Sequence, residues 1–299
     1  MAGPIVGYGF STVQGRDLAG LDADLARISG AGAGWAELSL FAMDVVTGGR
    51  PIRQRVQALE RLTGRHRLRY TAHGPMAVNL MEPEHEALFK RTVEGYLEVC
   101  GAVGASVLVL HTGIVRHEAQ GALDRRHGRE RSALRHLGDV AGRHGVTIAV
   151  ETVFAFGADR YTAAPSRLAR EIEAVEHPHV TGCLDISHAR LQCAQAGLDV
   201  EAELAAFAPV TGHIHIHDSF GLPETVRGFG PSETLAFGLG DVHLPLGWGD
   251  IPFTRILPTL GVRAGTVAVC ELPPHFLGET AACGETLTGW LPLVGARAV

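Results

Sequence analysis

The chain lacks the features that would tie it to a membrane or to nucleic acid. No apolar run approaches the length that spans a bilayer, and the N-terminus has neither the basic nor the apolar region of a secretory signal. The formal net charge of the 299 residues is −6 with histidine neutral, which does not favour binding to nucleic acid or to an anionic membrane. We therefore expect a soluble cytoplasmic protein whose partner is a small-molecule substrate.

Cysteine is also sparse and unpaired in the sequence. The five cysteines are an odd number and form no Cys-x-x-Cys motif: Cys100, Cys183, Cys193, Cys270 and Cys283. This pattern is typical of free, buried thiols in a reducing compartment and offers no paired-thiolate zinc site.

What the sequence does contain is a regular alternation of short β-branched or apolar runs with longer segments of helical composition. With 46% hydrophobic residues the chain can bury a large core. Such alternation is typical of a parallel α/β fold. The segments expected as strands are Ile5 to Phe10, Trp35 to Phe41, Leu68 to His73, Ser106 to His111, Val146 to Glu151, Val180 to Asp185, Gly212 to His217 and Thr266 to Glu271.

Helices are expected between these strands, several of them opening on a proline in the first turn. Their ranges are Leu18 to Gly30, Pro51 to Arg65, Pro83 to Val103, Glu130 to Gly145, Pro165 to Val175, His188 to Phe207, Pro252 to Leu260 and Glu279 to Val294. Eight strand-helix units of this size fit a single-domain (β/α)8 TIM barrel over residues 1–299. The one irregular connection, at about residues 218–251, is glycine-rich and too long for an ordinary loop, so we interpret it as a lid over the catalytic face.

Metal-ligand residue types stand at the ends of six consecutive predicted strands. In the segment Gly-His-Ile-His-Ile-His-Asp at 212–218, period-two alternation places the histidines on one face. Because all strands of such a barrel end at one mouth, these side chains should meet there. A single strand-end histidine or carboxylate is usually structural, but six together would be costly to bury without a metal. They are His73, His111, Glu151, Asp185, His215 and Glu271, and His188, Asp241 and His243 are expected to join them.

These residues lie in segments that resemble the xylose isomerase-like TIM-barrel superfamily, which includes sugar and sugar-phosphate isomerases and epimerases and endonuclease IV-like nucleases. The resemblance covers nearly the whole chain and is clearest from Leu68 to Glu271. The segments that carry it are Thr71-Ala-His73-Gly-Pro-Met-Ala-Val-Asn79-Leu, Leu108-Val-Leu-His111, Val150-Glu151-Thr, Cys183-Leu-Asp185-Ile-Ser-His188, His215-Ile-His-Asp218-Ser, Asp241-Val-His243 and Cys270-Glu271.

The resemblance implies one to three divalent metal ions per chain. An isomerase-type site would hold one ion, often manganese, through Glu151, Asp185, His215 and Glu271. A nuclease-type site would add one ion at His73, His111 and Glu151 and another at His188, Asp241 and His243. Imidazoles mixed with carboxylates suit Zn, Mn or Fe, and the ligand types alone do not separate these. Relatives often pair two barrels, so a homodimer is compatible with the resemblance, although the sequence leaves the oligomeric state open.

Two chemistries compete for such a site. In the first, Glu151 and Glu271 move a proton on opposite faces of a sugar carbon whose neighbouring oxygens a metal chelates, and His188 assists. In the second, clustered metals supply hydroxide and clamp a phosphodiester. The nucleases carry an aromatic residue and a leucine that wedge into DNA, whereas Met76 and Ala77 stand at the equivalent positions here.

The leading hypothesis is therefore a metal-dependent isomerase or epimerase of a small sugar-like or sugar-phosphate-like polyhydroxy substrate. The alternatives are an endonuclease IV-like multinuclear zinc phosphodiesterase, an iron-dependent oxidative enzyme on the same barrel, and a metal-binding protein without turnover. Four further side chains are candidates for substrate binding, namely Arg160, Arg227, Glu37 and His217.

Overall fold

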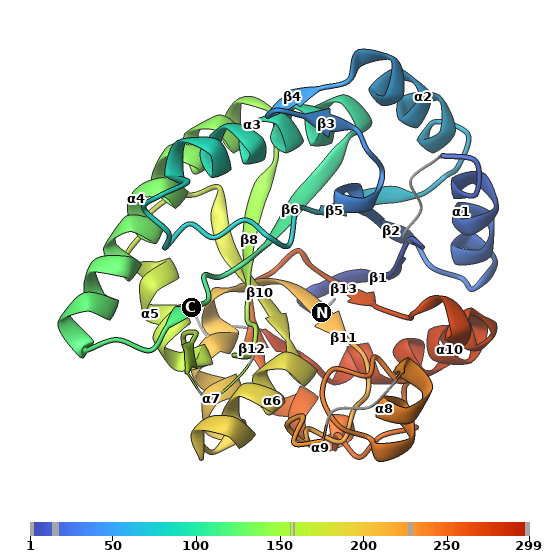
Figure 1. Ribbon diagram of the computed structural model, residues 1–299. Coiled ribbons are helices and arrows are strands. Elements are labelled where there is room, and N and C mark those ends of the chain that lie inside the picture. Colours follow the sequence, from blue (N-terminus) through green and yellow to red (C-terminus); the bar gives the residue numbers. More distant parts are fainter. Residues whose placement is uncertain (1–2, 14–17, 156, 158, 227–229, 297–299) are drawn as a thin grey trace.

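Eight parallel strands close into a barrel, as the sequence predicts (Figure 1). The computed structural model describes residues 3–13, 18–155, 157, 159–226 and 230–296. The strands follow one another around the barrel in the order β1, β13, β11, β10, β8, β6, β5, β2. Their bounds are β1 (Ile5–Ser11), β2 (Trp35–Ser39), β5 (Arg69–His73), β6 (Ala105–His111), β8 (Thr147–Glu151), β10 (Val180–Asp185), β11 (Thr211–Ile216) and β13 (Thr266–Cys270).

The alternation along β11 shows why this sequence forms a barrel strand. Ile214 and Ile216 face outward into the hydrophobic core under the helices and are almost completely buried. His213 and His215, on the other face of the same strand, are also completely buried but point into the barrel interior. A strand in a closed barrel has two buried faces, so the polar face is acceptable only if its side chains find partners there.

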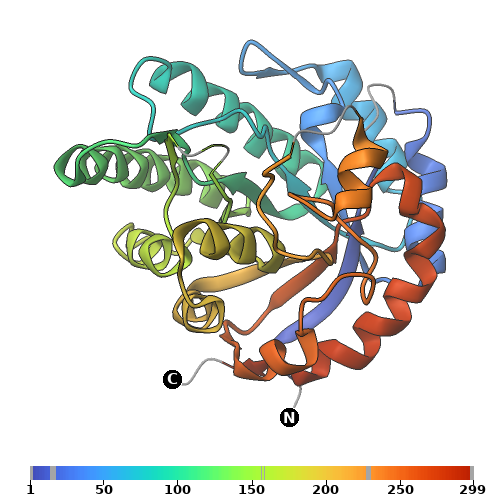
Figure 2. The ribbon, with the colours of Figure 1, turned by 60° about the horizontal axis from the view of Figure 1, so that its bottom comes forward.

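Helices surround the barrel on its outside (Figures 1 and 2). The α-helices of the ring are α1 (Leu21–Gly30), α2 (Arg53–Thr63), α3 (Glu86–Val103), α4 (Gln120–Arg143), α5 (Pro165–Glu173), α6 (Ile186–Ala196), α7 (Val200–Phe207), α9 (Phe253–Ile256) and α10 (Thr280–Trp290). Short 3-10 turns extend or join them at η1 (Leu40–Ala42), η2 (Ala208–Val210), η3 (Leu257–Thr259), η4 (Pro274–Glu279) and η5 (Leu291–Leu293). No helix within the described ranges is both long enough and apolar enough to pass through a lipid bilayer.

Two of the expected helices differ substantially from the prediction. The helix α4 begins at Gln120 instead of Glu130, because its arginine-rich first turns are balanced by acidic neighbours such as Glu118, 2.8 Å from Arg126. The helix predicted from His188 to Phe207 is divided in two, since Gly197 adopts a left-handed conformation with φ 65° after α6. A new helix, α7, then begins with the side chain of Asp199 as its N-cap.

Proline marks the start of a helix less often than the sequence suggests. Pro165 does open α5 at its first position. Pro51 instead lies in β4 (Arg50–Pro51), which pairs with β3 (Val46–Thr47) before α2 begins. Pro83 and Pro252 precede their helices. The fixed φ of proline suits turns and short edge strands as well as helix starts, so the residue alone did not identify the boundary.

The long connection after β11 folds back on itself over the C-terminal face. It contains α8 (Pro231–Phe237), and isolated bridges join Asp218 to Leu244 and Leu222 to Leu239. The carboxylate of Asp218 also accepts hydrogen bonds from the backbone N–H groups of Gly247 and Ile251, at 2.9 and 3.3 Å. These contacts fix the returning part of the connection, which brings Asp241 and His243 to the mouth of the barrel.

Two other short pairs of strands complete the fold. The strand β7 (Val115–Arg116) pairs with β9 (Arg160–Tyr161), and β12 (Gly261–Val262) pairs with β14 (Gly295–Ala296).

Candidate metal centre

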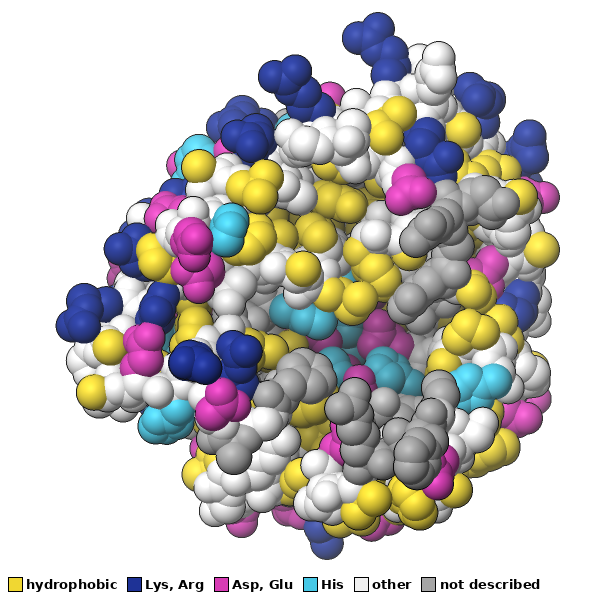
Figure 3. Space-filling view, viewed as in Figure 1, with side chains coloured by type: hydrophobic (Ala, Val, Ile, Leu, Met, Phe, Trp, Pro, Cys, Tyr) yellow, Lys and Arg dark blue, Asp and Glu magenta, His cyan; other side chains and the backbone are white. Residues whose placement is uncertain are grey.

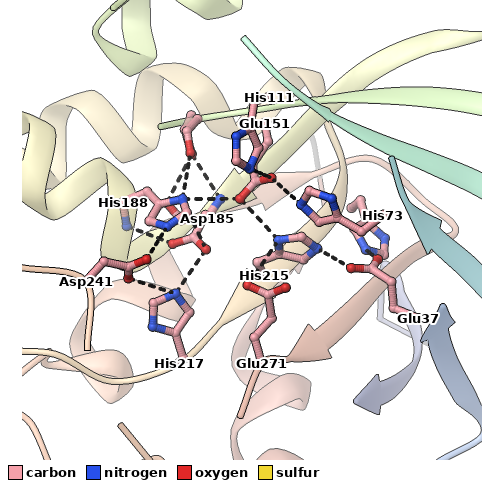
Figure 4. Close-up of polar contacts among 12 residues, drawn as sticks. Glu37, His73, His111, Glu151, Asp185, His188, His215, His217, Asp241 and Glu271 are labelled. Atoms are coloured by element: carbon pink, nitrogen blue, oxygen red, sulfur yellow. Dashed lines mark hydrogen bonds and ion pairs between the residues drawn. The ribbon is translucent and has the colours of Figure 1, made fainter. Parts of the chain in front are cut away.

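The predicted ligands converge on one cavity of about 320 Å³ at the C-terminal ends of the strands. Figure 3 shows histidine and acidic side chains together at the bottom of this central hollow, and Figure 4 shows how they face one another. Asp185 and His215 are completely buried beneath the cavity floor. The other seven predicted ligands line the cavity: His73, His111, Glu151, His188, Asp241, His243 and Glu271.

One group of potential ligands comes from three adjacent strands. His73, at the end of β5, places its Nε2 3.3 Å from Oε2 of Glu151, and His111, at the end of β6, places its Nε2 3.4 Å from the same oxygen. Parallel pairing sets His111 directly beside Glu151 of β8. The three ligand atoms lie close enough together to bind one metal ion.

A second group is centred on His215 of β11. Its Nδ1 lies 3.3 Å from Oε1 of Glu151 and 3.6 Å from Oε2 of Glu271, so the imidazole stands between the two carboxylates. Asp185, at the end of the neighbouring strand β10, belongs to the same group and also accepts a hydrogen bond from the backbone N–H of His188 at 2.7 Å. That N-cap bond fixes the start of α6 and thereby the position of His188.

The third group gathers around Asp241. Its Oδ2 lies 3.2 Å from Nε2 of His188 and 2.9 Å from Nε2 of His243. His217, which is completely buried, joins them with its ring stacked on that of His243 at 3.8 Å and its Nε2 3.1 Å from Asp185. His243 itself has φ 43°, a strained conformation for a residue other than glycine and one often found at functional sites.

The donor set fits a divalent metal. Oε2 of Glu151 is buried and has no hydrogen-bond partner, although two histidine nitrogens approach it. Leaving a buried carboxylate oxygen without a partner is costly, and a metal ion would satisfy it. Among the described lining residues there is no lysine or arginine that could balance the carboxylates instead. Which ion binds, and how many, stays a prediction.

The electrostatics of the cluster prepare some of the groups for metal binding. Burial favours the protonated form of Glu151, yet the surrounding histidines, His215 first among them, outweigh it and hold its pKa well below the usual value. Burial lowers the pKa of His111 to about 4, so this imidazole is neutral near pH 7. His243 behaves oppositely, since Asp241 outweighs its burial and raises its pKa to about 9. His111 therefore offers a free lone pair, whereas His243 must release a proton before it can bind a metal.

Beneath the cluster lies a buried carboxylate whose place the sequence analysis did not identify. Glu37 of β2 is completely buried and does not line the cavity that the described residues form. Its Oε2 accepts a hydrogen bond from Oγ1 of Thr71 at 3.0 Å and interacts with Nε2 of His213 at 2.9 Å. Its Oε1 lies 3.0 Å from Nε2 of His215. These contacts place Glu37 under the site, in contact with one of its histidines.

Glu37 thereby fixes the orientation of His215. Nε2 of His215 lies within ion-pair distance of this carboxylate, without the alignment of a hydrogen bond, and its Nδ1 faces Glu151 and Glu271. The histidines outweigh the burial of Glu37 and hold its pKa well below the usual value, so the carboxylate stays charged. A carboxylate on the far nitrogen of a ligating histidine is a common way to orient the ring and to increase its basicity.

We expect Glu37→Gln to weaken metal binding by about 10- to 100-fold, because the amide is neutral and orients His215 less strongly. The measurement is the metal dissociation constant from competition with a chromophoric chelator. Thr71→Val is the matched control, since it removes one hydrogen bond to Glu37 without touching His215. Equal metal affinity in Glu37→Gln and the parent protein would contradict the orienting role.

The remaining candidates for substrate binding lie elsewhere. Arg160 is exposed on β9 and is not among the residues that line the cavity, nor is His217. Arg227 lies outside the described residues. Met76 does line the cavity and is about half exposed at its mouth. Two aromatic lining residues, Phe41 and Phe154, were not anticipated, because nothing in their sequence positions separates them from core residues.

Comparison with known proteins gives a family and several similar folds. A family model described as a xylose isomerase-like TIM barrel matches residues 25–286. Among solved structures, a D-tagatose 3-epimerase-like protein is 18% identical, with a TM-score of 0.70 over 97% of this chain and 98% of its own. A D-allulose 3-epimerase from Methylomonas sp., solved in complex with D-allulose, is 16% identical, with a TM-score of 0.68 over 97% and 99%.

A third similar structure is an IOLI protein with a bound zinc atom, which is 17% identical with a TM-score of 0.65 over 95% of this chain and 96% of its own. At these identities the similarity demonstrates the shared fold. Comparison with curated proteins gave no match.

Proposed function

We propose that this chain, which belongs to the xylose isomerase-like TIM barrel family, is a divalent-metal-dependent isomerase or epimerase of a small hydroxy-carbonyl compound. The observation that carries the proposal is the placement of two carboxylates about one imidazole. Glu151 and Glu271 come from different strands, both line the cavity, and Nδ1 of His215 lies between them (Figure 4). The similar structures whose names describe sugar 3-epimerases support the same reaction class.

Epimerisation requires proton-transfer groups on both faces of one carbon, and two separated carboxylates can supply them. In the proposed reaction one carboxylate removes the proton from the carbon next to a carbonyl, and the other returns a proton to the opposite face. Glu151 suits the role of base because the histidines keep it ionised. Glu151, Asp185, His215 and Glu271 would hold the metal, which when bound polarises the carbonyl as a Lewis acid.

Deuterium exchange tests this proposal even where the product is unidentified. The protein is loaded with Mn²⁺ and incubated in D₂O with a panel of hydroxy ketones that includes D-tagatose and D-allulose. We expect deuterium to enter the C–H position next to the carbonyl of at least one compound, as read by NMR or mass spectrometry. Exchange should stop on treatment with a chelator and return with added metal. Absence of exchange throughout a chemically broad panel, with metal bound, would contradict the proposal.

A second candidate function is supported by the ligands that a one-metal site does not need. His73, His111, His188, Asp241 and His243 all line the same cavity as Glu151. A cluster of this size can hold several ions, which suits hydrolysis of a phosphodiester by a metal-activated water. Metal-dependent hydrolysis of bis(p-nitrophenyl) phosphate, in the absence of deuterium exchange, would favour this candidate over the isomerase.

A further inference from the structure

The cavity has a polar floor and an apolar wall. The floor consists of the histidines and carboxylates of the candidate metal centre, whereas the wall is formed by Phe41, Met76, Phe154, Leu272 and Pro273. Figure 3 shows hydrophobic side chains bordering the hollow in which the histidine and acidic groups are visible. We call these five residues the apolar wall.

The apolar wall begins immediately beside the cluster. The ring of Phe41 lies 5.4 Å from that of His73, edge to face, and the ring of Phe154 lies 5.4 Å from that of His188. Phe154 and Leu272 are each only 7% exposed, so packing holds them in place. A molecule that reaches the floor must therefore contact apolar side chains within its first few atoms.

Away from the floor, the part of the cavity lining that the structure describes has few groups that could recognise hydroxyls or anions. Apart from the cluster, the polar side chains among the described lining residues are Ser11, Thr12 and Ser39. Two of these bind each other, since Oγ of Ser39 donates to the carbonyl of Thr12 at 2.7 Å and Oγ1 of Thr12 accepts from N–H of Ser39 at 3.0 Å. No arginine, lysine, asparagine or glutamine is present among the described lining residues. A phosphate would normally be bound by such donors.

We propose that the substrate carries its reacting hydroxyl and carbonyl at one end of a predominantly apolar body and bears no phosphate. This inference rests on the proposed function, because the polar end is assigned to the floor that binds the metal. The apolar body lies against the wall, where leaving water is favourable, whereas a fully hydroxylated chain would lose hydrogen bonds to water there. The inference narrows the substrate class from the polyhydroxy sugars and sugar phosphates expected from the sequence.

Hydroxamates separate the two parts of the site, because they share one chelating head and differ in the body. Calorimetry on Mn²⁺-loaded protein would compare acetohydroxamate with benzohydroxamate. We expect benzohydroxamate to bind at least about 10-fold more tightly, since its phenyl ring is buried against the wall. D-ribulose 5-phosphate and D-ribulose form a second pair, in which we expect the phosphate to give no gain in affinity.

Variants of the apolar wall test whether its side chains cause the tighter binding of benzohydroxamate. In Phe154→Ala, and independently in Phe41→Ala, the ratio of the two hydroxamate affinities should fall toward one while acetohydroxamate binding is retained, which also demonstrates that the site is folded. Phe237→Ala is the matched control, because Phe237 is exposed on α8 and does not line the cavity. Its affinity ratio should equal that of the parent protein.

The outcomes distinguish this inference from the function on which it rests. Equal affinity for the two hydroxamates, an unchanged ratio in both wall variants, or tighter binding of the phosphorylated ribulose would overturn the inference alone. If acetohydroxamate fails to bind the metal-loaded protein, or if the protein retains no metal, the floor does not act as assigned. That result would overturn the inference and the proposed function together.

Discussion

Replacing Glu151 with glutamine is expected to abolish metal-dependent turnover and to remove most of the bound metal. Glu151 contacts all three ligand groups directly, through His73 and His111 on one oxygen and His188 and His215 on the other. Glutamine has the same shape but offers neither a charge nor a proton acceptor of comparable basicity. We expect a rate loss of about 10³-fold or more, since the change removes both a general base and a shared ligand.

Glu271→Gln separates these two contributions. Glu271 contributes to the group around His215 but makes no contact closer than 3.6 Å to the described histidines. We therefore expect it to retain more metal than Glu151→Gln while losing deuterium exchange to a similar degree. Metal content by mass spectrometry, exchange by NMR and thermal unfolding should be measured on both variants. Full exchange activity in both folded variants would eliminate the assigned proton-transfer pair.

The second large effect concerns the number of metal ions. If the group around Asp241 binds its own ion, protein purified without chelator should contain two or three ions per chain, and His243→Ala should lose one of them. Loss of a direct ligand is expected to lower the affinity for that ion by at least about 100-fold. His136→Ala is the matched control, because His136 is half exposed on α4, where it pairs with Glu94.

The opposite result is equally specific. About one ion per chain, unchanged in His243→Ala, would show that the group around Asp241 holds no metal. Asp241 and His243 would then have only a structural role in the loop. It would also remove the main support for the phosphodiesterase alternative. Several zinc or iron ions, with one lost in the variant, would instead make phosphoester hydrolysis and oxygen uptake the next assays.

The eight strands could be located from sequence because each is a short apolar segment, and the spacing of hydrophobic residues changes at its ends. Their observed bounds differ from the predicted ones by only a residue or two at most ends, as with Val180–Asp185, which matches. Helix boundaries were less accurate. The start of α4 depends on ion pairs such as Arg126 with Glu118, and the break after α6 depends on the conformation of Gly197, neither of which has a periodic signal.

The sequence by itself determined the barrel and the nine residues around its mouth, because parallel strands in a closed barrel all end at one face, whatever their separation along the chain. Only the tertiary structure placed Glu37 beneath His215 and added His217 to the group around Asp241. Glu37 and His213 are 176 residues apart and lie on strands that are not neighbours, so their contact crosses the barrel interior. The apolar wall likewise depends on packing between loops, since Phe41 and Phe154 acquire their role from the histidines they pack against.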